Sequence, residues 1–339
     1  MQLKEFKDKF DPLLIEFIEK KIKLLQIYKS PDLTKCLSHL KKLLGSGKRI
    51  RPYLSFLSYK AYGGTKDKDM MKLLVFMEIF HAFCLVHDDI MDKADKRHGI
   101  ETFHMLIKPP SLGNSIAILI GDFLFSWAFE ILLTNKDFDQ EKLERTKEIF
   151  LKMIDEVITG QFIDINLTGK KTSTEEEIYQ KMFLKTASYS FIRPLMIGKA
   201  LVGEIKDEKF FQEFGKSLGF AFQIQDDLFD IIYDTDEIFK SSFNDVQQRQ
   251  HTIFTNYIFE KGTNKQKTVL QTYFGKKIED KDKNKLIKIF NDSKSLEYGK
   301  KLIKGNLEKA KKLLKEESMI DTYKNNLLEF IDILNQRKS

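Results

Sequence analysis

The chain has 339 residues, of which 42% are hydrophobic, including 29 phenylalanines. This composition is sufficient for a sizeable core and excludes a largely disordered chain. The formal net charge of +7 arises from charges of both signs interspersed along the chain, so it does not indicate nucleic-acid binding.

The two cysteines, Cys36 and Cys84, have no metal-ligand spacing, so neither a disulfide framework nor a zinc site is predicted. The segment Met1–Phe10 mixes lysine and glutamate with apolar residues and lacks the hydrophobic stretch of a signal peptide. We therefore expect a reducing, cytoplasmic compartment.

Helical signals run through the whole chain. Only six prolines occur, and none follows position 194. Apolar residues recur three and four positions apart near the N-terminus, at Leu14, Phe17, Ile18, Ile22 and Leu25. Breaks between these patterns are short, so we expect an all-α fold with one domain over residues 1–339.

A basic segment, Gly47-Lys48-Arg49-Ile50-Arg51-Pro52, precedes the next predicted helix, which Pro52 can start. Three cations within four residues suit a diphosphate, and arginine can bind it bidentately. The segment does not match a Walker A loop. A lysine-rich surface turn is the alternative interpretation.

The first acidic cluster ends an apolar helix and contains Asp88, Asp89 and Asp92 in the pattern D-D-x-x-D. On a helix this spacing places the three carboxylates on one face. The basic segment Lys96-Arg97-His98 follows it. A single cluster of this kind is often no more than a solvated acidic helix end.

The stretch Gly113–Leu133 approaches the length of a membrane span, but Asp122 and Glu130 interrupt it. Burying two carboxylates in lipid is costly. We therefore expect a core helix of a large bundle and no transmembrane segment.

The second acidic cluster repeats D-D-x-x-D at Asp226, Asp227 and Asp230. Carboxylates about 4 Å apart repel by roughly 1 kcal/mol in water and about 4 kcal/mol at an effective dielectric of 20, so two opposed clusters require cations. Magnesium typically takes one or two carboxylates together with phosphate oxygens. The pair predicts a magnesium site for a phosphate-bearing substrate, with carboxylates lining the rim of an internal cavity.

With both clusters and the basic segment, the chain resembles the all-trans polyprenyl diphosphate synthase family, short-chain type, which includes farnesyl and geranylgeranyl diphosphate synthases. The resemblance runs from about Gly45 to Thr252. It also includes Gly121-Asp122, Gly160-Gln161, Lys185-Thr186-Ala187 and Phe222-Gln223-Ile224-Gln225, in the family's order. It implies a homodimeric helical bundle of the isoprenoid synthase type around a central cavity.

The resemblance also implies the site residues. The implied ligands of three magnesium ions, bridged by the substrate diphosphate, are Asp88, Asp89, Asp92, Asp226, Asp227 and, in support, Asp230. The residues implied to bind the allylic diphosphate are Arg97, Lys185, Gln223 and Lys240. Those that match the isopentenyl diphosphate site are Lys48, Arg51 and His81, with His98 at the place of a further contact. Arg49 and Thr186 are also implied to bind substrate. The residues implied to be catalytic are Asp88, Asp89, Asp92, Asp226, Asp227 and Lys185.

The implied reaction begins when metals and cations neutralise the departing pyrophosphate, so that the allylic C–O bond ionises to a carbocation. The isopentenyl double bond then attacks this carbocation. The released pyrophosphate accepts the proton that is lost, and no side-chain base is required.

Two positions depart from the family's pattern. His98 replaces the second arginine after the first cluster and is only partly charged near neutral pH. The family's Gly-Lys-x-Thr reads Arg249-Gln250-His251-Thr252 here. We hypothesise that Arg249 replaces the charge of the missing lysine and binds the allylic diphosphate.

The product length is predicted from the helix below Asp88. Cys84 lies one turn down and Phe80 two turns down, with Phe83 beside them. The two phenylalanines should block a chain roughly 8 to 12 Å below the metals, at about 1.5 Å per residue. This predicts a C15 to C20 product, whereas ordinary core packing is the alternative for both rings.

Two rival functions remain open at this point. Terpene cyclases share the bundle, but their second metal motif usually combines Asn or Asp, Ser or Thr, and Glu. A non-catalytic subunit of a heteromeric synthase would explain His98 and Gln250. It would not require six clustered carboxylates with their electrostatic cost.

Overall fold

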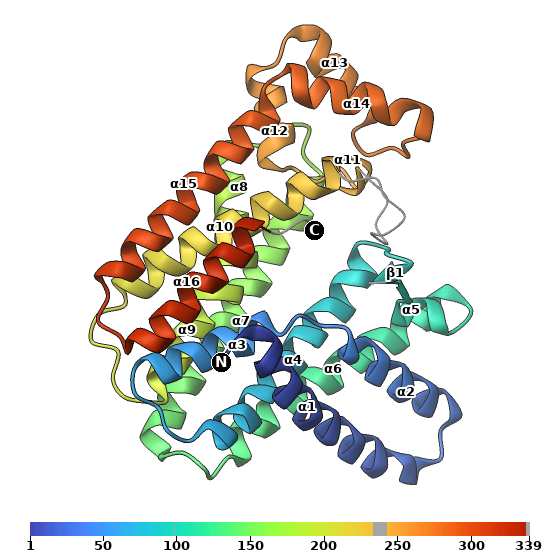
Figure 1. Cartoon of the computed structure of the whole chain (residues 1–339). Coiled ribbons are helices and arrows are strands. Elements are labelled where there is room, and N and C mark those ends of the chain that lie inside the picture. The colour runs from blue at the N-terminus through green and yellow to red at the C-terminus, as the bar shows by residue number, and fades with distance from the viewer. Residues whose placement is uncertain (98, 233–242, 337–339) are drawn as a thin grey trace. The chain divides into compact units, whose positions relative to one another are not determined.

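The computed structural model describes residues 1–97, 99–232 and 243–336, and these are almost entirely helical (Figure 1). This confirms the all-α prediction. The chain forms two compact units: unit 1 contains Met1–Lys147 and Ile197–Glu204, and unit 2 contains Glu148–Met196 and Ile205–Ser339. Each unit is described by itself below.

Unit 1 holds the first acidic cluster. Its elements are α1 (Leu3–Leu25), η1 (Gln26–Tyr28), α2 (Pro31–Gly45), α3 (Ile50–Ala61), α4 (Asp67–Met91), β1 (Lys96–Arg97), β2 (Ile100–Glu101), α5 (Phe103–Leu106), α6 (Pro110–Thr134) and the start of α7 (Gln140–Thr168). The end of α9 (Arg193–Ala200) also belongs to it.

Unit 2 holds the second acidic cluster and the rest of α7 and α9. Its other elements are α8 (Glu175–Met182), the π-helix η2 (Phe183–Ile192), α10 (Lys209–Ile232), α11 (Asn244–Gln247), α12 (Ile253–Lys261), α13 (Asn264–Tyr273), α14 (Asp280–Asp292), α15 (Ser295–Glu316) and α16 (Asp321–Gln336).

The core of unit 1 is formed where α4 packs along α6, its most extensive neighbour. In α4 nearly every residue from Met70 to Phe80 is buried, as its apolar sequence predicts. In α6 one face is buried and the other exposes Leu112, Leu119 and Leu133. The expectation that Gly113–Leu133 is a core helix is therefore correct for one face only.

Both α4 and α6 are long and apolar enough to cross a membrane by length and composition. Core helices of soluble proteins pass the same test, so two such helices are weak support for membrane insertion. The largely buried α4 is of that core type.

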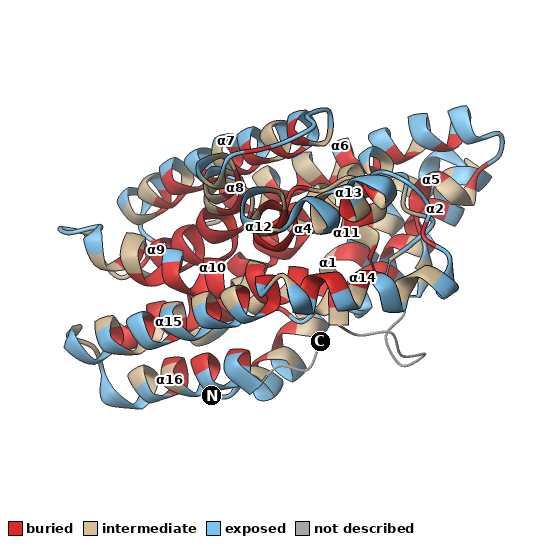
Figure 2. Cartoon of the chain, turned by 90° about the horizontal axis from the view of Figure 1, so that it is seen from above, coloured by how far each residue is buried: buried red, intermediate tan, exposed pale blue. Residues whose placement is uncertain are grey.

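The core of unit 2 surrounds α10, which packs most extensively on α15 and η2 and is buried along much of its length (Figure 2). A π-helix is rare and is found mostly at functional sites. Here it begins directly after α8 and contains Lys185 and Thr186. A Cβ atom at Gly160 of α7 would lie 2.5 Å from the backbone nitrogen of Lys185, so only glycine allows this close approach.

Candidate active site

The first acidic cluster lies at the C-terminal end of α4, where Asp92 caps the helix. Asp89 is only 2% exposed, and burial raises its pKa to about 6 despite the nearby Arg97 guanidinium. Arg97 donates from Nε to Asp89 Oδ1 over 2.7 Å and from Nη2 to Asp88 Oδ2 over 3.2 Å. A single guanidinium thus bridges two of the three predicted ligands.

Arg97 is brought to these carboxylates by a short hairpin. Strands β1 and β2 pair antiparallel, with Arg97 opposite Ile100. Gly99 has φ +77°, a left-handed conformation that glycine adopts readily at a tight turn. His98, predicted to bind substrate, lies outside the described residues.

The three cations of the basic segment before α3 differ in their exposure to solvent. Lys48 is exposed and Arg51 is half-buried. Arg49 is only 2% exposed; it donates to Asp11 over 2.6 Å, to Glu78 over 3.1 Å, and to the carbonyl of Leu44. This environment favours a structural role for Arg49 over the substrate-binding role predicted from the sequence.

The predicted pocket floor is a cluster of aromatic rings. The ring centroid of Phe83 lies 5.4 Å from that of Phe80 and 5.0 Å from that of Phe125 in α6. Phe125 in turn packs against Phe129 in a tilted arrangement, with ring centroids 5.1 Å apart. Phe80 is fully buried, whereas Phe83 and Cys84 are half-buried, like His81 on the same helix. Sequence reasoning missed Phe125, because α6 carries no motif that marks it.

In unit 2, hydrogen bonds connect η2 to the second acidic cluster. Thr186 donates its hydroxyl to Gln223 Oε1 over 2.6 Å, and Gln223 Nε2 donates to Asp227 Oδ1 over 2.8 Å. Burial raises the pKa of Asp227, and the Lys181 charge is the foremost influence that opposes this rise. The predicted residues Thr186, Gln223 and Asp227 are therefore brought together.

Asp230, the last residue of the second cluster, caps the short helix α11. Its Oδ1 accepts hydrogen bonds from the backbone and side-chain nitrogens of Asn244, at 3.0 and 3.1 Å. Its Oδ2 accepts from the backbone nitrogen of Asp245 at 2.9 Å. These bonds are consistent with a supporting position for Asp230. Asp226 is half-buried on the same helix.

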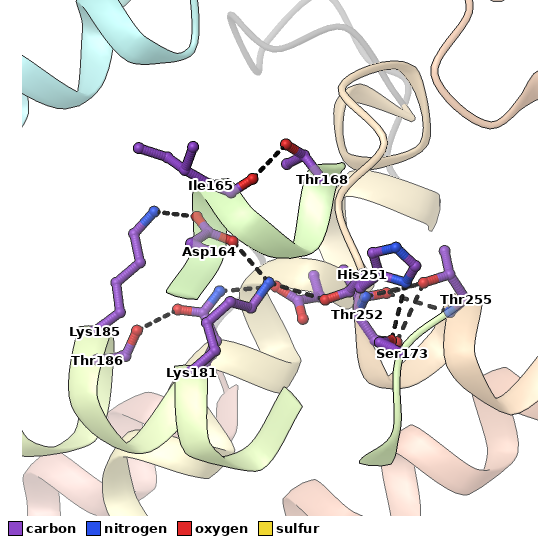
Figure 3. Close-up of polar contacts among 12 residues, drawn as sticks. Asp164, Ile165, Thr168, Ser173, Lys181, Lys185, Thr186, His251, Thr252 and Thr255 are labelled. Carbon is purple, nitrogen blue, oxygen red and sulfur yellow. Dashed lines mark hydrogen bonds and ion pairs between the residues drawn. The ribbon is translucent and has the colours of Figure 1, made fainter. Parts of the chain in front are cut away.

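Asp164 of α7 is a site residue that the sequence reasoning missed (Figure 3). Its Oδ2 lies 2.6 Å from Lys185 Nζ, and its Oδ1 lies 3.0 Å from Lys181 Nζ. Burial would raise its pKa, but the two lysines outweigh that effect and lower the pKa to about 2. One feature of the sequence could have indicated Asp164: it is the single carboxylate in an otherwise apolar helical stripe. The buried residues of this stripe are Met153, Val157, Gly160, Asp164 and Leu167.

The segment with the altered motif precedes α12, which Thr252 caps by accepting from the backbone nitrogen of Thr255 (Figure 3). Arg249 has φ +60°, a left-handed conformation that favours glycine, which is the residue in the family's pattern. Its methylene groups face Gly275. Lys240, predicted to bind the allylic diphosphate, lies outside the described residues.

The donor set fits magnesium. Both clusters offer only carboxylate oxygens, the ligand type that magnesium takes in proteins. Burial raises the pKa values of Asp89 and Asp227, and a bound cation would favour their charged forms. Within the described ranges, no three carboxylate, histidine or cysteine side chains form a metal-holding group by themselves.

The site residues fall into two groups. The basic segment, His81, the first cluster and Arg97 lie in unit 1, whereas Lys185, Thr186, Gln223, the second cluster and Arg249 lie in unit 2. Within unit 1 the structure brings Arg97 to the first cluster, and within unit 2 it brings Thr186 and Gln223 to Asp227. The roles of the other residues stay predictions. That the two clusters face one another stays a prediction.

Relatives in sequence agree with this arrangement. Residues 32–290 match the family model described as polyprenyl synthetase. The chain is 31% identical to a short chain isoprenyl diphosphate synthase of Methanocaldococcus jannaschii, over 86% of this chain and 85% of that protein. It is 32% identical to a geranylgeranyl diphosphate synthase of Saccharolobus solfataricus, over 80% of each chain.

Solved structures agree in fold. A geranylgeranyl pyrophosphate synthase from Corynebacterium glutamicum, complexed with isoprenyl diphosphate and magnesium, superposes with a TM-score of 0.92 at 24% identity over all of both chains. The geranylgeranyl pyrophosphate synthetase from Pyrococcus horikoshii gives 0.82 at 27% identity, over 98% of this chain and all of that one.

The helical fold and the repeated aspartate motif define the class of the isoprenoid synthase bundle. Within that class, this chain belongs to the polyprenyl synthetase family, because the family model matches most of the length of the chain. It is a prenyltransferase enzyme.

Proposed function

We propose that this chain extends an allylic diphosphate with isopentenyl diphosphate to an all-trans prenyl diphosphate of C15 to C20. The observation that carries the proposal is the pair of D-D-x-x-D clusters, each with one almost fully buried aspartate. Arg97 donates a hydrogen bond to Asp89 of the first cluster, and the Lys181 charge acts on Asp227 of the second. The relatives named geranylgeranyl diphosphate synthase support the product class. None of the relatives compared is named as a non-catalytic subunit, so the alternative has no support.

The magnesium ions are held by Asp88, Asp89 and Asp92 and by Asp226 and Asp227, with Asp230 in support. When bound, they supply positive charge that stabilises the departing pyrophosphate. Lys185 donates to the same diphosphate from η2, and Arg97 does so from the hairpin. The neighbouring Thr186 gives its one hydroxyl hydrogen to Gln223 and so positions that side chain. We assign three ions to each site.

Lys48, Arg51 and His81 bind isopentenyl diphosphate in unit 1. With the leaving diphosphate neutralised, the allylic C–O bond breaks and the electron pair leaves with pyrophosphate. The isopentenyl double bond then forms the new C–C bond, and the proton lost afterwards passes to pyrophosphate. The ring cluster around Phe83 limits how far the product can grow.

The chain acts as a homodimer through its exposed apolar helix faces. On α7, four exposed side chains recur at helical spacing, namely Leu151, Ile158, Phe162 and Ile165. Such a stripe is unusual on a monomer surface and suits a self-complementary contact. Light scattering behind gel filtration should show a dimer, and Phe162→Glu should shift it toward monomer.

Both units belong to one polyprenyl synthetase domain, because the family match runs through both. We place the enzyme in the cytoplasm, where its two free cysteines stay reduced.

The activity is tested with purified protein, magnesium, isopentenyl diphosphate and each of the five-, ten- and fifteen-carbon allylic diphosphates. We expect turnover that chelation abolishes. Asp88→Ala and Asp226→Ala should each lower kcat on the order of a hundredfold or more. Asp292→Asn, on the exposed end of α14, is the matched control. No turnover with any starter would favour the non-catalytic role.

A further inference from the structure

Lys181 of α8 shares one carboxylate with Lys185 of η2. The two ammonium groups hold opposite oxygens of Asp164, at 3.0 and 2.6 Å (Figure 3). Asp164 is 5% exposed and Lys181 is 12% exposed, so these charges are mostly withdrawn from water. The two ammonium groups share the single negative charge of Asp164, and the Lys181 charge also acts on Asp227 of the second cluster. Asp164 alone therefore does not neutralise both lysines, and an anionic ligand beside them would be stabilised.

Lys181 also contacts the segment with the altered motif. Its Nζ donates to the carbonyl oxygen of His251 over 2.9 Å. An ammonium group has three donors, and the contacts to Asp164 and His251 use two of them. Next to His251, position 250 carries an uncharged glutamine whose buried Oε1 has no hydrogen-bond partner among the described residues.

We propose that Lys181 binds the diphosphate of the allylic substrate and supplies from α8 the positive charge that position 250 lacks. This inference rests on the proposed function. Because Lys181 and Lys185 reach the same carboxylate, both ammonium groups lie beside the same space. Asp164 orients them while leaving donors for phosphate oxygens. Asp164 is thus a positioning residue, and Lys181 is a binding residue.

The test compares Lys181→Met with the parent enzyme. We expect the KM for the allylic diphosphate to rise about tenfold, equivalent to the loss of one charge-assisted contact, with the KM for isopentenyl diphosphate unchanged. Lys170→Met is the matched control. Lys170 forms an ion pair at the surface with Glu177, which lies on α8 like Lys181. It should leave both constants as in the parent.

Rescue separates binding from folding. Gln250→Lys in the Lys181→Met background returns a lysine to the neighbouring segment and should restore most of the allylic affinity. A structural role for Lys181 would instead lower the melting temperature, and Gln250→Lys would not restore the affinity. That outcome would overturn the proposal.

Calorimetric titration of the full chain with pyrophosphate and magnesium gives a readout that needs no turnover. Weaker pyrophosphate binding by Lys181→Met than by the parent supports the proposal even where the parent shows no catalysis. Equal binding by the two proteins overturns it. An inactive parent would count against the proposed function only.

Discussion

Arg97 and Asp89 form a close ion pair between a surface hairpin and the buried end of α4, with Nε 2.7 Å from Oδ1. The hairpin position therefore depends on the charge of a carboxylate that is also a predicted magnesium ligand. Any change at either residue should affect both stability and metal binding.

Replacing Arg97 by methionine should destabilise the magnesium-free protein by about 2 kcal/mol, because Asp89 loses its charged hydrogen-bond partner. Thermal denaturation measures the loss. Magnesium should restore part of it by neutralising Asp89 directly. Lys96→Met, at the exposed neighbouring strand position, should change little. Equal melting temperatures for the two variants would contradict this account.

Arg49 and Lys48 should respond in opposite ways to the same substitution. Arg49→Met leaves Glu78, which is 3% exposed, without its buried partner and should cost about 3 kcal/mol of folding free energy. Lys48→Met should leave stability unchanged but raise the KM for isopentenyl diphosphate. Urea denaturation and steady-state kinetics on both variants test the assignment. A kinetic defect in stable Arg49→Met would restore the substrate-binding interpretation.

The aromatic cluster below the first acidic cluster should set the product length. Phe83→Ala and Phe80→Ala remove rings 5.4 Å apart, and we expect products at least one five-carbon unit longer. Chromatography of the dephosphorylated products measures the length. Phe123→Ala is the control, because that ring packs against Trp127 instead. Unchanged products from both variants would leave the rings as ordinary core.

The buried His251 should make stability depend on pH. Its Nε2 donates to the carbonyl of Lys170, so its Nδ1 accepts from the Ser173 hydroxyl. Burial, reinforced by the charges of Lys181 and Arg249, lowers the pKa of His251 below 6.5. As the pH is lowered, His251 is protonated in the unfolded chain before it is protonated in the folded one. The free energy of unfolding therefore falls as the pH drops from 6.5 toward the pKa of His251 in the folded state.

Urea titrations between pH 5 and 8 measure that slope. His251→Gln should flatten the slope over this window, although its absolute stability is lower. An unchanged slope would assign the dependence to another group.

The sequence predicted well what depends on local spacing. The clusters at Asp88 and Asp226 lie on helices as expected, because helical period and D-D-x-x-D spacing are local properties. The burial of Arg49 was not predicted, because its partners Asp11 and Glu78 are distant in sequence. The sequence alone does not distinguish the three cations of this segment, because which of them is buried depends on the tertiary fold.

Residues that act across helices were harder to find. Phe125 became part of the ring cluster only through the packing of α6 on α4. Lys181 belongs to no sequence motif. Its proposed role in substrate binding follows only from the ion pairs that Lys181 and Lys185 both form with Asp164. A charged residue within an apolar helical stripe is the one local signal that would have identified Asp164.

The contact of Gly160 with Lys185 is made between main chains, which cannot repack as side chains do. An alanine at position 160 would push its methyl group to within 2.8 Å of the Lys185 Cα atom. The two helices would have to separate at the point where Lys185 reaches Asp164. Mutational tolerance should therefore be lowest at this crossing, lower than at larger buried side chains where neighbours can adjust.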